Sequence, residues 1–180
     1  NGGMAMNVYN NLKVFEKNIE ILTNDNWEDI KKIRFVEERS NHMFLRVDER
    51  DKSYGRVNLD NIDFSVYDAI IVSDYNKGFL TTDDLYKISV SHKKTFLDTK
   101  KILGEWSENF TFIKINGIEY QNTKDVISDK VKERLIVTQG SRGCFFKEKK
   151  YDVSLVEVKD VSGAGDTFLA AFSFKFLVCN

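Results

Sequence analysis

Four short apolar runs in the sequence each end in a cluster of polar residues. The runs and their polar ends occupy residues 69–78, 95–101, 110–119 and 135–143. Short, continuous runs of β-branched and aromatic residues are typical of strands that are buried on both faces. Their polar ends carry, in order, Asp74, Asp98, Asn116 and Thr138. Ligands bind beyond the carboxyl ends of parallel strands, so four such clusters predict a binding site at one edge of a sheet.

Helical patterns lie before and between these runs. Thr81 and Asp84 have the spacing of a capping box at the start of the segment 81–94. Near the start of the chain, apolar residues recur at helical spacing, namely Ala5, Val8, Leu12, Phe15 and Ile19. Alternating strands and helices predict an α/β domain with a mostly parallel sheet. Asp, Asn and Gly after a strand are also common turn formers, but four clusters in register favour a site.

Two further segments have different patterns. Residues 33–58 alternate partly and carry many charges, which predicts exposed strands that form a flap, or lid, beside the sheet. Residues 143–158 predict a hairpin whose turn is the charged run from Lys147 to Lys150. No repeat or low-complexity linker divides the chain, so residues 1–180 are expected to form a single domain.

Composition excludes several classes of protein. The 180 residues carry a net charge of −1, without the basic excess of a nucleic-acid-binding protein. The longest apolar run, 167–178, is shorter than the roughly 20 residues of a membrane span. Cys144 and Cys179 form no CxxC motif, which favours a reducing cytoplasm. Because residue 1 is Asn rather than Met, we also expect the chain to be a fragment.

The stretch from Gly163 to Asp166 places three small residues and a carboxylate directly before the apolar run from Thr167. Small residues let the backbone turn sharply and approach a ligand closely. The free N–H groups at a helix start favour an anion. An acid beside such an anion site suits a general base that takes a proton from a hydroxyl during phosphoryl transfer. The stretch alone fits equally well with Asp166 as a helix cap.

Other site types find no support in the sequence. Phe168 stands where the dinucleotide fingerprint GxGxxG requires its third glycine, and no GxxxxGK[ST] loop occurs. His42 and His92 stand alone, which indicates exposed or structural histidines rather than a metal cluster or a Ser-His-Asp triad.

Four motifs together resemble the ribokinase-like (PfkB) carbohydrate kinases. DVSGAGDTF at 160–168 resembles the family's C-terminal signature, and NGGMAMNVYNNL at 1–12 resembles its early substrate segment. NGIE at 116–119 is similar to its NxxE motif, and VTQGSRG at 137–143 to its nucleotide loop. Within the family, residues 39–48, 72–81 and 96–101 look most like the heptose 7-phosphate kinases of lipopolysaccharide precursor synthesis. The resemblance implies a three-layer α/β/α fold with a small β lid.

The resemblance also implies a role for each matching residue. Asp166 would be the catalytic base, and the N–H groups of Gly163, Ala164 and Gly165 would form the anion hole. Further residues would bind the nucleotide (Asn116, Glu119, Thr138, Gly140, Gly143), with Glu119 reaching Mg²⁺ through water. Others would contact the substrate (Gly2, Gly3, Asn7, Lys77, Asp98, Lys100). Asp160 and Ser162 stand where the family often holds a monovalent cation such as K⁺.

The expected activity is transfer of the γ-phosphoryl group of ATP, with Mg²⁺, to a hydroxyl of a small-molecule sugar or sugar phosphate. Asp74 and Lys77 favour heptose 7-phosphate, phosphorylated at its anomeric hydroxyl. The alternatives are another sugar or nucleoside kinase of the family, for ribose or fructose, and a non-catalytic binding relative. Family members often dimerise through the lid, so a homodimer is a further expectation. An arginine of the lid (Arg34, Arg39 or Arg46) could bind a distal phosphate of the substrate bidentately.

Overall fold

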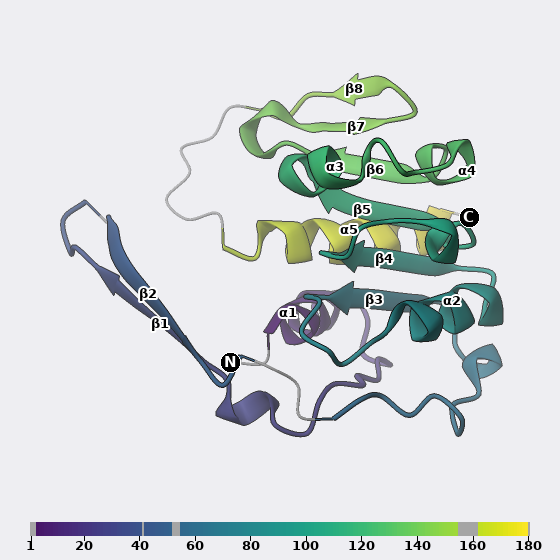
Figure 1. The fold of residues 1–180 in the computed structure, drawn as a ribbon, viewed down its shortest axis with the longest axis horizontal. Helices are drawn as coiled ribbons and strands as arrows, with labels where there is room; N and C mark the ends of the chain where they lie inside the picture. The colour runs from purple at the N-terminus through teal and green to yellow at the C-terminus, as the bar shows by residue number, and fades with distance from the viewer. Residues whose placement is uncertain (1–2, 41, 52–54, 155–161, 180) are drawn as a thin grey trace.

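The computed structural model describes residues 3–40, 42–51, 55–154 and 162–179. A six-stranded sheet of order β3-β4-β5-β6-β7-β8 lies between two layers of helices (Figure 1). Its parallel part consists of β3 (Ile70–Asp74), β4 (Thr95–Thr99), β5 (Phe112–Asn116) and β6 (Leu135–Thr138). Its antiparallel edge consists of β7 (Cys144–Phe146) and β8 (Lys149–Tyr151). The predicted α/β class and the four predicted strands are therefore confirmed.

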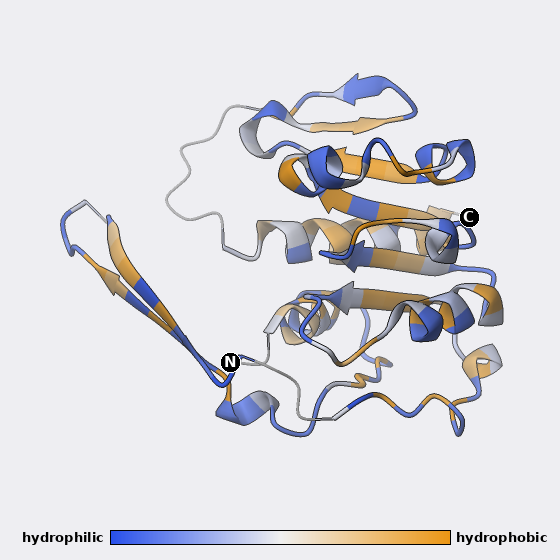
Figure 2. Cartoon of the chain, in the orientation of Figure 1, coloured by the Kyte–Doolittle hydropathy of each residue, from blue (hydrophilic) through white to orange (hydrophobic). Residues whose placement is uncertain are grey.

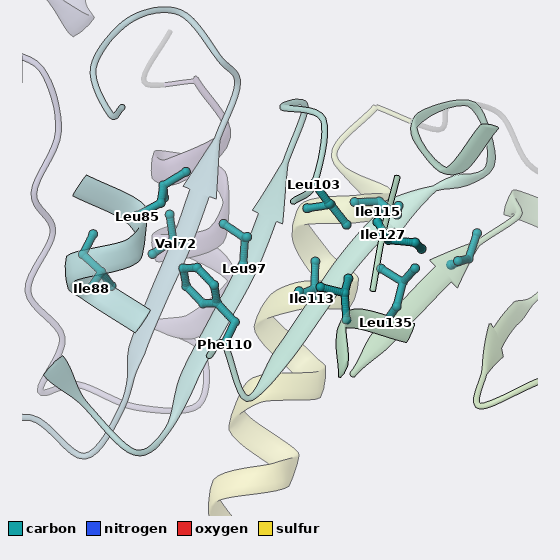
Figure 3. Close-up of a cluster of buried hydrophobic side chains, with 12 residues drawn as sticks. Val72, Leu85, Ile88, Leu97, Leu103, Phe110, Ile113, Ile115, Ile127 and Leu135 are labelled. Carbon is teal, nitrogen blue, oxygen red and sulfur yellow. The ribbon is translucent and has the colours of Figure 1, made fainter. Parts of the chain in front are cut away.

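One face of the sheet is covered by α2 (Thr82–Ser91), α3 (Gly117–Thr123) and α4 (Asp129–Lys132). Leu85 and Ile88 of α2 pack against Val72 of β3, and Leu97 and Ile113 of the neighbouring strands continue the same core (Figure 3). The parallel strands are largely apolar along their length, as burial on both faces requires (Figure 2). Short 3₁₀ helices lie at Trp27–Asp29, Phe64–Val66, Glu105–Ser107 and Gly140–Arg142.

The other face is covered by α1 (Gly3–Leu12) and α5 (Ala164–Cys179). Leu169 and Ala170 of α5 pack with Val8 and Leu12 of α1 against Phe96 of β4. Only one stripe of α5 is fully buried, so the helix is less enclosed than its continuous apolar sequence predicts.

The expected continuation of α1 to Phe15 and Ile19 is wrong, because the helix ends at Leu12. The ring of Phe15 stacks on that of Phe174 with centroids 5.0 Å apart, and Ile19 packs against the same core. The periodic spacing beyond Leu12 therefore reflects burial by an irregular chain, not a helix.

The predicted capping box of α2 is present. Thr81 Oγ1 accepts a hydrogen bond from the N–H of Asp84, whose carboxylate accepts one from the N–H of Thr81. We expect Thr81→Ala to lower the free energy of unfolding by about 1 kcal/mol, because one N–H of the first turn loses its acceptor. Urea denaturation would measure the change. Thr82→Ala, at the exposed next position, is the control; equal losses in the two variants would contradict the capping role.

The predicted lid is a hairpin of β1 (Lys31–Val36) and β2 (Met43–Glu49). It stands beside the edge of the sheet toward which the arrowheads of β3, β4 and β5 point (Figure 1). Both strands thus lie within 31–49, and the described residues 50, 51 and 55–58 form no strand. The ladder pairs Lys32 with Asp48 and Arg34 with Arg46 on one face of the hairpin.

The β7–β8 hairpin turns at Lys147 and Glu148, whose φ angles are +48° and +63°. The predicted turn was too long, since Lys149 and Lys150 belong to β8. The predicted hairpin segment 155–158 lies outside the described residues. Within the described part of the chain, no helix combines the length and the apolar character needed to cross a membrane.

Candidate active site

The carboxyl ends of the four parallel strands meet the start of α5 at one edge of the sheet (Figure 1). This edge carries most of the residues that the sequence singles out. Asp98 and Asn116 lie on β4 and β5, and Thr138 ends β6. Asp166 comes from the first turn of α5 and Asn7 from α1. The topology thus brings together segments from both ends of the chain.

The turn before α5 depends on Gly163. Its φ of +78° lies in the left-handed region that favours glycine, and its carbonyl accepts a hydrogen bond from the N–H of Thr167 at 2.9 Å. The helix therefore begins at Ala164, earlier than the expected Thr167. The N–H groups of a first turn have no partner within their own helix, so this turn can bind an anion.

Asp166 lies inside that first turn, with 5% of its surface exposed. Its Oδ2 accepts a hydrogen bond from Asn7 Nδ2 at 2.8 Å. Since Gly163 occupies the capping position, the interpretation of Asp166 as a simple helix cap loses its geometric basis. Burial raises the pKa of Asp166, while the Asn7 hydrogen bond and the charges of Lys114, Lys100 and Lys32 oppose that rise. A carboxylate with a raised pKa beside an anion site is suited to accept a proton.

Lys114 lies directly beneath the glycine turn. It occupies β5, is 7% exposed, and pairs with Asp98 on β4, with Nζ 2.7 Å from Oδ2. A Cβ atom on Gly165 would lie 2.7 Å from the Lys114 Nζ, so the second glycine of the motif leaves room for this ammonium group. The arrangement adds a positive charge to the N–H groups at the start of α5.

Sequence reasoning missed Lys114, although a signal was present. The stretch Phe112–Asn116 is an apolar strand with one charge at its third position. A charge within a buried strand needs a partner, and the one opposite in the register is Asp98. Burial raises the pKa of Asp98 to about 6, although Lys114 counteracts the rise.

The NxxE motif forms a capping box at the start of α3. Asn116 Oδ1 accepts hydrogen bonds from the N–H groups of Ile118 and Glu119, both at 2.9 Å. Glu119 Oε2 accepts one from the N–H of Asn116 at 2.7 Å, and Oε1 pairs with Lys100 Nζ at 3.0 Å. The spacing of the motif therefore has a local structural cause that the sequence analysis overlooked. Lys100 Nζ also lies 4.6 Å from the centre of the Tyr75 ring.

A pocket of about 530 Å³ opens beyond the ends of β5 and β6. Predicted nucleotide residues that line it are Asn116, Thr138 and Gly140. Gly143 is not among its lining residues. A Cβ there would lie 1.9 Å from the carbonyl oxygen of Tyr151, so the close approach of β8 explains this glycine.

The remaining predicted residues are less closely gathered. Gly3 starts α1 with a φ of +64°, whereas Lys77 is paired with Asp51 at 2.9 Å. Asp74 is buried and accepts hydrogen bonds from Thr99 and Lys101. Ser162 is exposed in the turn before α5.

Two predicted residues, Gly2 and Asp160, lie outside the described residues. Within the described ranges, no group of three or more His, Cys, Asp or Glu side chains could hold a metal ion. A magnesium ion that arrives on a nucleotide needs few protein ligands, because it keeps several waters and the phosphates. Glu119 directly follows Ile118 of the pocket lining, and its carboxylate, which already accepts from the Asn116 N–H and from Lys100, could still hold a hydrated ion through water.

The mostly parallel sheet between two helical layers, with a small antiparallel lid, is the fold that the resemblance to ribokinase-like kinases implied. Residues 110–177 match the family model for the pfkB family carbohydrate kinases, the family that the sequence motifs resemble. The chain is also 32% identical, over 186 aligned residues and 88% of its length, to the bifunctional protein HldE of a Nitratiruptor species. It spans 40% of the length of that protein.

Proposed function

We propose that the protein is an ATP-dependent sugar kinase whose catalytic base is Asp166. The observation that carries the proposal is the position of Asp166, buried in the first turn of α5 near the ammonium group of Lys114, which lies beneath Gly165 of the same turn. The match to carbohydrate kinases over residues 110–177 supports it. Phosphoryl transfer needs mainly positioning and charge stabilisation, and these groups are of the types that supply both.

In the proposed reaction, Asp166 takes the proton of the sugar hydroxyl as its oxygen bonds to the γ-phosphorus of ATP. The bond from that phosphorus to the bridging oxygen of ADP breaks, and ADP leaves. The N–H groups of Gly163 to Gly165 and the Lys114 ammonium stabilise the charge on the transferred group. Asn7 of α1 orients Asp166 through the hydrogen bond that it donates to the carboxylate. Asn116, Thr138 and Gly140 would bind the nucleotide and Glu119 the hydrated Mg²⁺, which would neutralise phosphate charge. Gly143 would support the nucleotide loop.

Heptose 7-phosphate is the proposed acceptor, phosphorylated at its anomeric hydroxyl. The support for this acceptor is the resemblance of residues 39–48, 72–81 and 96–101 to heptose kinases, together with the similarity to the bifunctional protein HldE. Gly2, Gly3, Lys77, Asp98 and Lys100 remain proposed substrate contacts, and Asp160 with Ser162 a proposed monovalent-cation site.

The assembly and location of the protein are also part of the proposal. Ile33, Phe35 and Leu45 are exposed on the face of the lid opposite its arginines, which supports a homodimer through the lid. Cys144 and Cys179 are free thiols, as in a protein of the cytoplasm. We further propose residues 1–180 as one kinase domain, whose lid, expected at 33–58, is the hairpin of β1 and β2 at 31–49.

The test is ADP release with Mg-ATP over a panel of sugars and sugar phosphates, using the full-length protein. We expect turnover with heptose 7-phosphate. Turnover with ribose or fructose alone would keep the kinase and reject the heptose assignment. A non-catalytic binding relative is the alternative, and the capping box of Asn116 and Glu119 favours it, because it explains the motif without magnesium. A folded protein that binds ATP but turns over no sugar would support that alternative.

A further inference from the structure

The two faces of the lid hairpin have opposite chemistry. The cross-strand pairs Ile33 with Val47 and Phe35 with Leu45 form the apolar part of one face. Lys32 opposite Asp48 and Arg34 opposite Arg46 form the other. Side chains alternate strictly between the two faces of a ladder, so the three cations lie on the same side. Over these two pairs the hairpin therefore presents a face with three cations and one carboxylate, Asp48.

This basic face is turned toward the active-site edge of the sheet. Lys32 Nζ lies 4.8 Å from the centre of the Tyr75 ring, and Tyr75 directly follows the last residue of β3. Lys32 also pairs with Asp51 at 3.7 Å, and its charge is among those that oppose the raised pKa of Asp166. Lys100 also makes a cation–π contact with the Tyr75 ring. The same ring is therefore in contact with the lid, through Lys32, and with the active-site edge of the sheet, through Lys100. Arg34 lies two residues further along the same face.

Two of the three cations on this face, Lys32 and Arg46, are paired with carboxylates, whereas Arg34 is not paired with any carboxylate of the described residues. Arg46 is held bidentately by Asp48, with Nε and Nη2 at 2.8 and 2.9 Å from the two carboxylate oxygens. Among the residues that the structure describes, Arg34 has no ion-pair partner, and the side chain directly opposite it is the like-charged Arg46. Like charges directly opposite in a ladder are unfavourable, and a bound dianion would reverse that.

We infer that Arg34, with Arg46 opposite, binds a phosphate group carried by the acceptor sugar, and that it selects phosphorylated over unphosphorylated acceptors. A guanidinium group matches phosphate bidentately, and a second arginine directly across the ladder can share the same dianion. Asp48 fixes Arg46 in place, and the Lys32–Tyr75 contact fixes the orientation of the face. This inference rests on the proposed kinase function and assigns the residue that recognises the phosphate of its acceptor.

The test compares heptose 7-phosphate with the same heptose without its phosphate, using the full-length protein. Arg34→Gln is expected to raise the KM for heptose 7-phosphate about 10- to 100-fold, the range for a lost charged hydrogen-bond pair. The KM values for ATP and for the unphosphorylated heptose should stay unchanged. Arg34→Lys, which keeps the charge without the planar fork, should fall between. Lys31→Gln removes a charge from the same strand on the opposite face and is the control.

Several outcomes would overturn the inference. One is an unchanged KM for heptose 7-phosphate in Arg34→Gln, and another is an equal rise for both sugars. A wild-type protein that turns over only unphosphorylated sugars would also reject it while leaving the kinase function in place. If no sugar is turned over, the kinase proposal fails separately. Calorimetric titration with heptose 7-phosphate then decides: binding that Arg34→Gln loses supports the phosphate site, and no binding by the wild type rejects it.

Discussion

Replacing Asp166 with Asn is expected to lower kcat for ADP release by about 10²- to 10⁴-fold, the usual contribution of a general base. The side chain keeps its shape and can still accept the hydrogen bond from Asn7, but it can no longer take a proton. The KM for ATP should change little, because the proposed nucleotide residues lie on β5, α3, β6 and the 3₁₀ helix after β6, away from α5 along the chain. Steady-state kinetics at saturating ATP would measure both parameters.

The same substitution should not destabilise the fold. Burial raises the pKa of Asp166 in the folded protein, so its stability contribution is present below the unfolded pKa and is lost as pH rises through the folded pKa. Above the folded pKa the buried carboxylate is ionised and therefore a cost that Asn removes, so in that range the Tm of Asp166→Asn should equal or exceed that of the wild type. If the variant were inactive because it had unfolded, its Tm would instead be lower than that of the wild type.

The matched control is Asp129→Asn. Asp129 also lies in the first turn of a helix, but its side chain is 95% exposed. We expect no change in kcat there, because only the buried acid faces the anion site. An Asp166→Asn enzyme with wild-type turnover would reject the assignment of the base. In the wild type, kcat should fall as pH drops through the raised pKa of Asp166, whereas the residual rate of the variant should not follow that profile.

The parallel strands of the sheet could be predicted from the sequence. Continuous apolar runs predicted β3 to β6 because a strand buried on both faces is mostly apolar, and its few polar residues need partners within the fold. The same logic failed after Leu12, where Phe15 and Ile19 keep helical spacing without a helix. The apolar spacing shows which residues are buried. It does not show whether the backbone between them is helical, because that depends on the elements against which these residues pack. Here that element is α5, which lies far along the chain, at Ala164–Cys179.

The site was predictable where function lies in one continuous stretch. The turn at Gly163–Asp166 could be singled out from the sequence, although the stretch alone fitted a general base and a helix cap equally well. The pairing of Lys114 with Asp98 was not predicted, since it depends on the register of two strands 16 residues apart. The position of Arg34 opposite Arg46 likewise depends on the register of the β1–β2 ladder, and the sequence alone does not give that register. Contacts between residues on neighbouring strands can be identified only once the pairing of those strands is known.

Lys114→Met is expected to lower both stability and activity. The substitution leaves Asp98, which is 2% exposed, without its partner, and breaking a buried pair in this way costs about 3–5 kcal/mol. It also removes a positive charge from beneath the proposed anion hole, which should lower kcat by about 10²- to 10³-fold. Urea denaturation would give the free energy of unfolding, and ADP release the activity.

The pH dependence of that stability loss identifies its cause. Burial already raises the pKa of Asp98 to about 6, and loss of Lys114 must raise it further. Below that range Asp98 is protonated in both proteins, so the loss should be small at about pH 5 and large at about pH 8. Asp98→Asn combined with Lys114→Met should recover much of the stability at the higher pH without restoring kcat. Lys130→Met, which removes one member of an exposed pair with Glu108, should cost little at either pH. A loss in Lys114→Met that is equal at the two pH values would mean that packing, rather than the buried charge of Asp98, makes Lys114 necessary.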